Sequence, residues 1–297
     1  MAVVPFASRD HLSRRSALIA ASAAALARPA WAAGPGDSIA ALERRYGGRL
    51  GVSALELGSG RRIEHRAGER FPMCSTFKLL AVGATLYRVE HGHDDLKRRI
   101  AFTSHDLLHN APIARTHMRT DGTGTMTLAQ TCAAAIEWSD NTAANLILRE
   151  LGGPPRVTAF ARTIGDERTR LDRNEPSLNA AVPGDPRDTT TPASMGADAR
   201  TLLFGPALGT NASLLRSWML ACRTGATRIQ AGVPATWRCG SKTGSGDYAT
   251  ANDVVFLIPP GRPPIVVAAY YTGSHAGDDQ QDAVLAAVGR IVAEHIG

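Results

Sequence analysis

The sequence has little of the features that mark several specialised classes of protein. Only 5% of its 297 residues are aromatic, and no basic cluster is interleaved with aromatic side chains, so the pattern of a nucleic-acid-binding protein is missing. After residue 32, no apolar stretch approaches the roughly 20 residues that span a bilayer. That part of the chain also holds no internal repeat, long linker or low-complexity tract. These absences leave an ordinary globular protein as the class to expect.

The composition fits that class. Apolar residues make up 44% of the chain and charged residues 20%, which are usual values for a globular protein, and the length allows one large domain or two small ones. The formal net charge is +6. Residues 1–32 hold four arginines and one aspartate, a net of +3, which leaves +3 for the remaining chain. Such a mild positive charge indicates a solvated surface and not a site for a polyanion.

The N-terminal segment has the pattern of an export signal. Arg14-Arg15 precedes an apolar, alanine-rich run, and Ala30-Trp31-Ala32 has the small-x-small spacing of a cleavage site. Paired arginines are typical of the twin-arginine route. A membrane anchor would need a longer apolar stretch, and Arg28-Pro29 interrupts this one. We therefore predict that residues 1–32 are a cleaved signal peptide of the twin-arginine type and that the product reaches the periplasm without a membrane anchor.

The order of predicted elements places strands at both ends of the chain and helices in the middle. Strand patterns lie at 49–56, 61–65, 236–245, 251–258 and 264–272. Helical patterns lie at 37–46, 75–90, 127–138, 141–151, 156–164, 191–204, 212–222 and 279–296. We expect an α/β protein of the α+β type, with a five-stranded antiparallel sheet flanked by terminal helices. The sheet domain would comprise 33–70 and 221–297, with an all-helical domain of residues 71–220 inserted between its strands.

Ser75 and Lys78 are three residues apart at the start of a predicted helix. Both side chains would then lie on one face, near the free N–H groups of the helix N-terminus. A serine hydroxyl needs a base within hydrogen-bond reach to become a nucleophile, and burial lowers the pKa of a lysine toward that task. An ordinary capped helix start explains the same pattern when it stands alone.

Two further motifs supply hydroxyl, amide and ammonium groups. In Ser139-Asp140-Asn141, between two predicted helices, the serine can relay a proton to a leaving nitrogen and the asparagine amide can donate to a substrate carbonyl. In Lys242-Thr243-Gly244, on a predicted strand, the first two side chains can anchor a substrate carboxylate. The backbone N–H groups of Ser75 and Ser245 could converge there as an oxyanion hole. Taken singly, the first motif is also a plain helix N-cap and the second a solvated strand end.

Residues 170–188 form the most informative segment. Three prolines among alternating acidic and basic residues indicate a loop. A long ordered loop in a compact domain is usually functional, and a disordered linker is the alternative. Arg173 and Asp188 could close the loop with a salt bridge. Glu175 would then act as a general base, with Asn179 helping to position a water molecule.

In this order and spacing, the four motifs resemble those of the class A serine β-lactamases, and the resemblance covers nearly all of the chain after residue 32. It implies a fold like that of the DD-peptidases and β-lactamases, hydrolysis of the β-lactam amide of penicillins and cephalosporins, and resistance to these drugs. It also implies no cofactor, no metal, no partner beyond the small-molecule drug, and a monomer. The catalytic residues would be Ser75, as the acylated nucleophile, Lys78, Ser139 and Glu175. The substrate-binding residues would be Asn141, Asn179, Lys242, Thr243, Ser245 and Arg228.

Several positions depart from the family pattern. Carbapenem-hydrolysing members often pair the cysteine before the nucleophile with one two residues after Lys-Thr-Gly, and that second position is Gly246 here. We therefore expect Cys74 to be unpaired and all four thiols to be free, with a Cys222–Cys239 bond as the alternative. Arg228 resembles an arginine that substitutes for a strand arginine of many relatives. The entrance at His109-Asn110 and the loop at 119–124 leave the ranking of penicillins, cephalosporins and carbapenems open.

Other classes of protein share part of these features. Penicillin-binding enzymes and β-lactam sensor domains use the same serine and lysine motifs but keep the acyl-enzyme for long times, and the Glu175 loop argues against both. A zinc hydrolase would suit the metal-ligand spacing of His91-Gly92-His93-Asp94-Asp95. No second cluster of ligands accompanies it in the sequence, and the stretch is also typical of a polar turn.

Overall fold

The computed structural model describes residues 1–3, 34–275 and 277–297. Nearly all of the predicted signal peptide, residues 1–32, therefore lies outside the described residues. Residues 35–297 form one compact unit. None of the described helices combines the length and the apolar character that crossing a bilayer requires.

The compact unit contains helices, strands and short 3₁₀ turns. The helices are α1 (Pro35–Tyr46), α2 (Phe77–Glu90), α3 (Pro112–Thr116), α4 (Leu128–Glu137), α5 (Asn141–Leu151), α6 (Pro154–Thr163), α7 (Pro192–Phe204), α8 (Asn211–Leu220), α9 (Ile229–Gly232) and α10 (Asp278–Ile296). The strands are β1 (Arg49–Glu56), β2 (Arg62–His65), β3 (Phe71–Pro72), β4 (Arg99–Thr103), β5 (Thr123–Thr127), β6 (Thr189–Thr190), β7 (Arg238–Gly246), β8 (Thr250–Ile258) and β9 (Ile265–Thr272). The 3₁₀ turns are η1 (Cys74–Thr76), η2 (Ser104–Asp106), η3 (Ser177–Ala180) and η4 (Pro206–Leu208).

The main sheet joins the two ends of the chain. Its five strands lie in the order β2-β1-β9-β8-β7, and every neighbouring pair is antiparallel. β1 pairs with β9 from Arg49 opposite Thr272 to Glu56 opposite Ile265. The five-stranded antiparallel sheet expected from the sequence is therefore confirmed.

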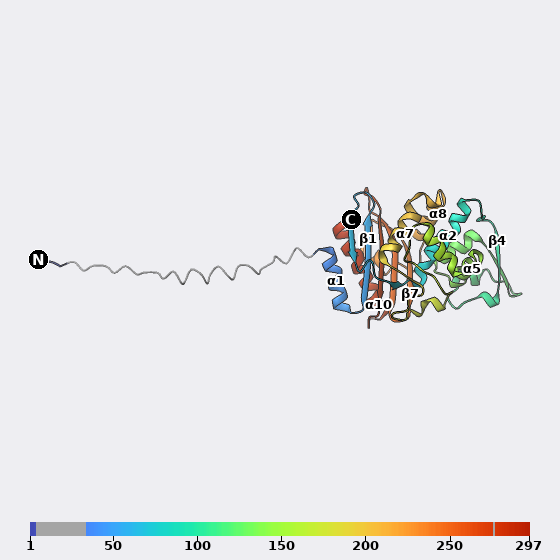
Figure 1. Ribbon diagram of the computed structural model, residues 1–297, viewed down its shortest axis with the longest axis horizontal. Helices are drawn as coiled ribbons and strands as arrows, with labels where there is room; N and C mark the ends of the chain where they lie inside the picture. Colours follow the sequence, from blue (N-terminus) through green and yellow to red (C-terminus); the bar gives the residue numbers. More distant parts are fainter. Residues whose placement is uncertain (4–33, 276) are drawn as a thin grey trace. The chain divides into compact units, whose positions relative to one another are not determined.

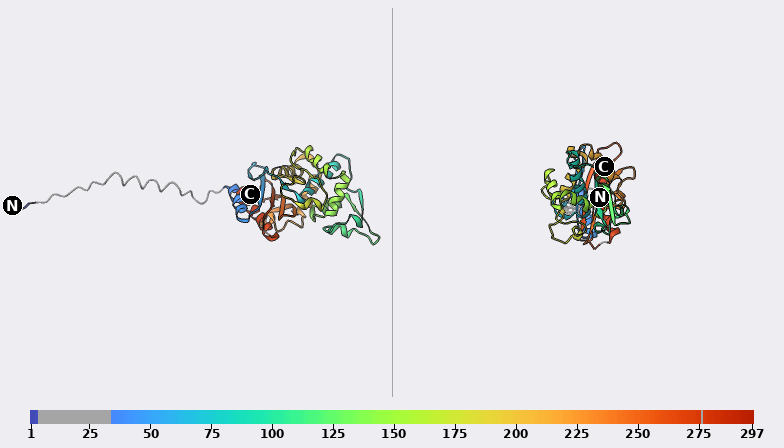
Figure 2. Two further views of the ribbon diagram at one scale, coloured as in Figure 1. Left: turned by 60° about the horizontal axis from the view of Figure 1, so that its bottom comes forward. Right: turned by 90° about the vertical axis from the view of Figure 1, so that its right-hand side faces the viewer.

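Both faces of this sheet are buried. Along β9, Val266, Ala268 and Tyr270 belong to one hydrophobic cluster, whereas Val267 and Tyr271, among others, belong to a second. Side chains alternate between the two faces of a strand, so one strand serves both clusters. Figure 1 and Figure 2 show α1 and α10 on one side of the sheet and α2, α5 and α8 on the other. Burial on both faces explains why β8 and β9 have nearly continuous apolar sequences.

The region between the sheet segments is mainly helical, and its helix ends follow the local chemistry. Thr127 accepts from the Gln130 N–H as the N-cap of α4, in the predicted capping box. Pro192 lies in the first turn of α7, where its missing N–H costs nothing. Gly152 ends α5 in the left-handed conformation, with φ of 95°.

The expectation that residues 71–220 are all-helical needs correction. β4 pairs with β5, and β3 pairs with β6, in two small antiparallel sheets. β4 alternates exposed and buried residues over only five positions, too few to stand out among the turn residues around it. β3 and β6 are too short for any periodicity. The boundaries at residues 70 and 220 stay a prediction.

Candidate active site

The turn that carries Ser75 is held against the sheet by backbone contacts. Ser75 lies in η1, directly before α2. The Asn252 side chain on β8 donates to the carbonyl oxygens of Pro72 and Met73 at 2.9 and 3.1 Å. A Cβ at Gly244 on β7 would lie 2.8 Å from the Met73 carbonyl oxygen. Glycine at this position therefore allows the turn that carries the nucleophile to lie against β7.

Lys78 is the centre of the hydrogen-bond network. Its fully buried Nζ donates to Ser75 Oγ at 2.9 Å, to Asn141 Oδ1 at 2.7 Å and to the Ser139 carbonyl oxygen at 2.8 Å. It also lies 3.0 Å from Glu175 Oε1. Burial lowers the pKa of Lys78, while the charge of Glu175 opposes that shift. Burial thus favours the neutral amine, the form that can accept a proton.

Ser139 lies between two lysines. Lys242 Nζ donates to Ser139 Oγ at 3.0 Å, and Lys78 Nζ approaches the same oxygen at 3.3 Å. Burial, and next the nearby charge of Lys78, lower the pKa of Lys242 to about 7. Asp140 fixes this junction, because its carboxylate accepts from the Ala143 N–H at the start of α5 and from backbone N–H groups of α3.

Glu175 contacts the nucleophile beside Lys78. Ser75 Oγ donates to Glu175 Oε1 at 3.1 Å, and Asn179 Nδ2 donates to Glu175 Oε2 at 2.5 Å. Asn179 Oδ1 is buried and has no hydrogen-bond partner among the described residues. The backbone of Glu175 is held on both sides by Asn145, whose amide donates to the Glu175 carbonyl and accepts from its N–H, each at 2.9 Å.

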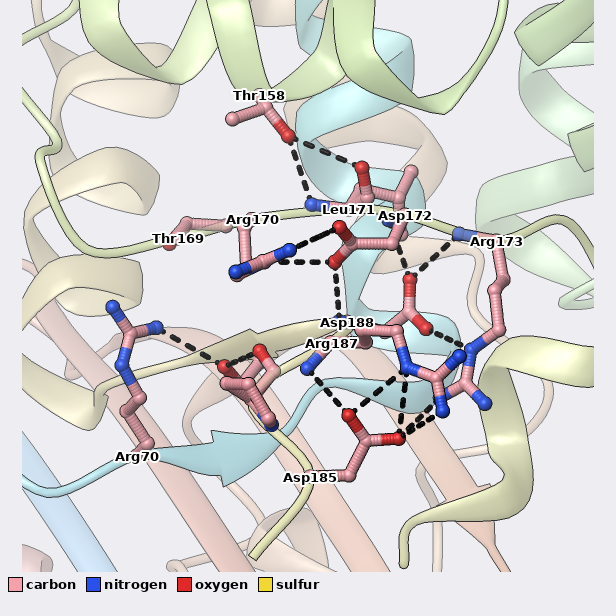
Figure 3. A network of polar contacts seen from close by, with 12 residues as sticks. Arg70, Thr158, Thr169, Arg170, Leu171, Asp172, Arg173, Asp185, Arg187 and Asp188 are labelled. Atoms are coloured by element: carbon pink, nitrogen blue, oxygen red, sulfur yellow. Dashed lines mark hydrogen bonds and ion pairs between the residues drawn. The ribbon is translucent and has the colours of Figure 1, made fainter.

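The Glu175 loop, residues 170–188, is ordered and closed at its neck (Figure 3). Asp188 pairs with Arg173 Nε at 2.5 Å and accepts from the backbone N–H groups of Asp172 and Arg173 at 2.7 and 2.9 Å. Asp172 accepts in turn from the Asp188 N–H and pairs with Arg170. The predicted salt bridge is confirmed, and the alternative of a disordered linker is wrong.

The end of β7 forms the remaining wall. Arg228 donates to Ser245 Oγ at 2.7 Å and to the Gly244 and Asn252 carbonyl oxygens at 2.8 Å, and Asp282 pairs with its Nε. Thr243 Oγ1 lies 2.5 Å from Thr224 Oγ1. This arrangement places a guanidinium and several hydroxyls at one edge of the site.

These side chains surround a single cavity of about 200 Å³. It is lined by Ser75, Asn110, Ser139, Asn141, Asn179, Thr224, Arg228, Thr243, Gly244 and Ser245. The other three predicted site residues, Lys78, Glu175 and Lys242, are almost fully buried and hydrogen-bond to residues of this lining. All ten residues selected from the sequence therefore meet at one place.

Three residues that position the site, Asn145, Thr224 and Asn252, were not among those predicted from the sequence. Asn145 lies one helical turn after Asn141 on α5, so its spacing offered a signal. Thr224 and Asn252 offered none, because their roles depend on contacts across the fold. Their shared property is to hold backbone or hydroxyl groups in place.

The cysteines and the histidine-rich turn take no part in this site. All four cysteines are free, as we expected, and burial raises the pKa of the Cys74 thiol well above its usual range, which argues against an activated thiol. His91 Nδ1 is within hydrogen-bond distance of the Tyr87 carbonyl oxygen and Asp94 pairs with Arg98. The described residues contain no group of three or more side chains suited to hold a metal ion.

Comparison with known proteins agrees with this geometry. Residues 35–296 match the model of the β-lactamase enzyme family. The chain is 48% identical over 259 residues to β-lactamase CTX-M-25 of Escherichia coli, which covers 87% of this chain and 88% of that protein. It is 47% identical over 261 residues to β-lactamase AST-1 of Nocardia asteroides, which covers 87% of this chain and 82% of that protein. A solved ancestral class A β-lactamase superimposes with a TM-score of 0.85 at 53% identity, covering 88% of this chain and 99% of that one. The chain therefore belongs to the β-lactamase enzyme family and is a class A member.

Proposed function

We propose that this protein hydrolyses the β-lactam amide of penicillins and cephalosporins through an ester on Ser75, and that it thereby confers resistance to these drugs. The observation that carries the proposal is the position of one carboxylate. Glu175 Oε1 lies 3.1 Å from Ser75 Oγ and 3.0 Å from Lys78 Nζ. A nucleophile with a lysine and a carboxylate in contact can be both acylated and released.

In the acylation step, Ser75 Oγ attacks the lactam carbonyl and gives up its proton. Lys78 Nζ at 2.9 Å and Glu175 Oε1 at 3.1 Å are both within reach of that proton, so either group can be the base. The lactam nitrogen then leaves with a proton from Ser139 Oγ, which Lys242 and Lys78 contact. The N–H groups of Ser75 and Ser245 would stabilise the oxyanion.

In the deacylation step, Glu175 takes a proton from the water that attacks the ester. Asn179 supports this role, because its Nδ2 donates to Glu175 and its buried Oδ1 is left to accept a hydrogen bond. Asn145 holds the Glu175 backbone, so the carboxylate is fixed before substrate arrives.

Substrate would be held at the two ends of the cavity. Lys242, Thr243, Ser245 and Arg228 form a cationic and hydroxyl-rich edge suited to the ring carboxylate of a β-lactam. Asn141, whose Oδ1 accepts from Lys78, has an amide Nδ2 left to donate to the side-chain carbonyl of the drug.

The test is the substitution Glu175→Ala. We expect benzylpenicillin to acylate Ser75 in this variant and to stay attached, because no carboxylate activates water, so intact-mass spectrometry shows a persistent adduct. Glu167→Ala removes an exposed carboxylate near the base of the same loop and should keep full turnover. Ser75→Ala should form no adduct. Rapid loss of the adduct from the Glu175 variant would contradict the role given to this residue.

We also propose that the protein is exported and acts as a monomer. Arg14-Arg15 and Ala30-Trp31-Ala32 support export by the twin-arginine route, and replacement of both arginines by lysine should retain the precursor in the cytoplasm. Among the residues that the structure describes from Pro35 onward, the large exposed apolar side chains are Trp138, Val182 and Tyr248, which is too few for an obligate interface. Light scattering should give the mass of one chain, and a dimer mass would overturn this expectation.

A further inference from the structure

A second and larger cavity lies on the other side of the Glu175 loop. It has a volume of about 600 Å³, against about 200 Å³ for the catalytic cavity. One wall consists of loop residues between Leu178 and Arg187. The other consists of the end of the sheet where β1 begins and β9 ends, at Gly48-Arg49 and Thr272-Gly273, together with Arg70 and Pro72. We call it the back cavity. Its volume lies in the range of pockets that bind small organic molecules.

Positive charge is in excess around the back cavity. Its lining includes Arg49, Arg70, Arg173, Arg187 and only one acidic residue, Asp185. Arg49 pairs with Glu69, Arg173 with Asp188, and Arg187 with Asp185. Three carboxylates therefore neutralise three of the four guanidinium groups.

Arg70 is the fourth, and it lacks a carboxylate partner among the described residues. Its Nη1 donates to the Arg168 carbonyl oxygen at 2.7 Å and to Thr189 Oγ1 at 3.1 Å. Figure 3 shows its side chain reaching toward the strand segment that returns from the Glu175 loop. Both acceptors are uncharged, and a guanidinium has five N–H donors. Arg70 thus keeps donors and a net charge for a carboxylate or phosphate, groups that arginine binds in a bidentate manner.

Part of the lining is apolar. This part comprises Pro72, Leu178, Ala181, Val182, Pro183 and Pro186, and glycines and two threonines complete the lining. Val182 is an exposed large apolar side chain, whereas Leu178 is almost completely buried. An occupant with a hydrocarbon or aromatic body would cover these surfaces while its anionic end met Arg70.

We propose that the back cavity binds a small amphipathic anion and that its occupation changes the rate of deacylation. The coupling runs through η3, which separates the two cavities. Leu178 and Ala181 line the back cavity, while Asn179, between them, lines the catalytic cavity and donates to Glu175. The Asn179 carbonyl oxygen also accepts from the Asp247 N–H at 2.9 Å, next to the end of β7. An occupant packed on Leu178 therefore acts on the turn that positions the Glu175 carboxylate.

Binding is tested without reference to activity. The purified protein is titrated with 4-phenylbutyrate, phenyl phosphate and the neutral 4-phenylbutyramide while backbone amide NMR signals are followed. We expect saturable shifts around Ala181, Val182 and Thr189 with one or both anions and none with the amide. The two anions decide between carboxylate and phosphate. No saturable shift with either anion, or shifts only around Ser245 and Thr243, would overturn the proposal.

Two variants and a matched control locate the site. Arg70→Gln should weaken binding about tenfold, the effect of losing one charge-assisted contact. Val182→Glu should do the same by repulsion, without disturbing the hydrogen bonds of Arg70. Arg200→Gln removes an arginine that lines other surface grooves and should leave binding unchanged. Equal affinity in all four proteins would show that the anion binds elsewhere.

The coupling is tested by deacylation, and this part alone depends on the proposed function. Decay of the penicilloyl adduct, followed by mass spectrometry, should change at least about twofold at saturating anion in the wild-type protein and not in Arg70→Gln. An unchanged decay in the wild type would refute the effector role. If the wild type hydrolyses no β-lactam, the proposed function fails, and the NMR titration still decides whether the site exists.

Discussion

Two buried lysine amino groups meet at one hydroxyl in this protein. Lys78 and Lys242 both contact Ser139 Oγ, at 3.3 and 3.0 Å, and both side chains are fully buried. Two like charges this close in a low-dielectric setting would repel strongly, and the Glu175 carboxylate, 3.0 Å from Lys78 Nζ, offsets one of them. A proton or an anion that binds at one lysine therefore changes the pKa of the other.

The pH dependence of Lys242 gives a prediction. Its pKa is lowered to about 7 by burial and by Lys78, so the free enzyme loses the positive charge at this position as pH rises through that value. We expect kcat/KM for benzylpenicillin, which carries a carboxylate, to fall on the alkaline side. In Lys242→Arg the charge persists, and the fall should move up by at least about one pH unit. An alkaline limb at the same pH in both proteins would assign the titration to another group.

The Glu175 loop is an element whose shape depends on one buried acid. Asp188 is completely buried and connects the two ends of the loop through Arg173 and two backbone N–H groups. The Arg170–Asp172 pair at the same neck is far more exposed. The loss of a buried ion pair lowers stability far more than the loss of an exposed one. The two pairs at the neck therefore allow a matched comparison.

We predict that Asp188→Asn destabilises the protein by about 2–4 kcal/mol, because Arg173 loses its nearest and buried carboxylate and keeps that of Asp185 at 3.7 Å. Arg170→Gln should cost at most about 1 kcal/mol. Since the loop carries Glu175, the Asp188 variant should also release the penicilloyl group more slowly. Urea denaturation and the decay of the adduct measure the two effects. Equal losses in the two variants would mean that the neck is not organised around Asp188.

The sequence predicted the bounds of those helices and strands that are determined by their own residues and the turns beside them. The bounds of β1 and α5 agree with the expected residues, because turn glycines and a cap delimit them. β4 and β5 were missed because their pairing across a turn-rich segment is not a local property. The motifs likewise selected residues that touch the reacting groups, whereas Thr224 and Asn252 act on other protein atoms and carry no mark in the sequence.

Stability belongs to the whole molecule, and one buried acid pair makes it depend on pH. Asp198 on α7 and Asp166 after α6 are both almost fully buried, and the Oδ2 atom of each has no hydrogen-bond partner among the described residues. Burial, and next the charge of Asp166, raise the pKa of Asp198 to about 9, while the pKa of Asp166 is lowered by backbone and side-chain hydrogen bonds that outweigh its burial. The pair therefore holds one proton at neutral pH.

The direction of the effect follows from linkage. An unfolded aspartate ionises near pH 4, but Asp198 stays protonated in the folded protein up to about 9. Between these values the folded state binds more protons, so the free energy of unfolding falls as pH rises. In Asp198→Asn the amide donates to Asp166 without taking up a proton. The fall in the free energy of unfolding with rising pH should therefore disappear. As pH rises from 5 to 8, we expect the free energy of unfolding of the variant to increase by about 1–3 kcal/mol relative to that of the wild type, measured by urea denaturation. Glu167→Gln, an exposed neighbour, should follow the wild type, and an Asp198 variant with the wild-type pH dependence would show that the pair does not share a proton.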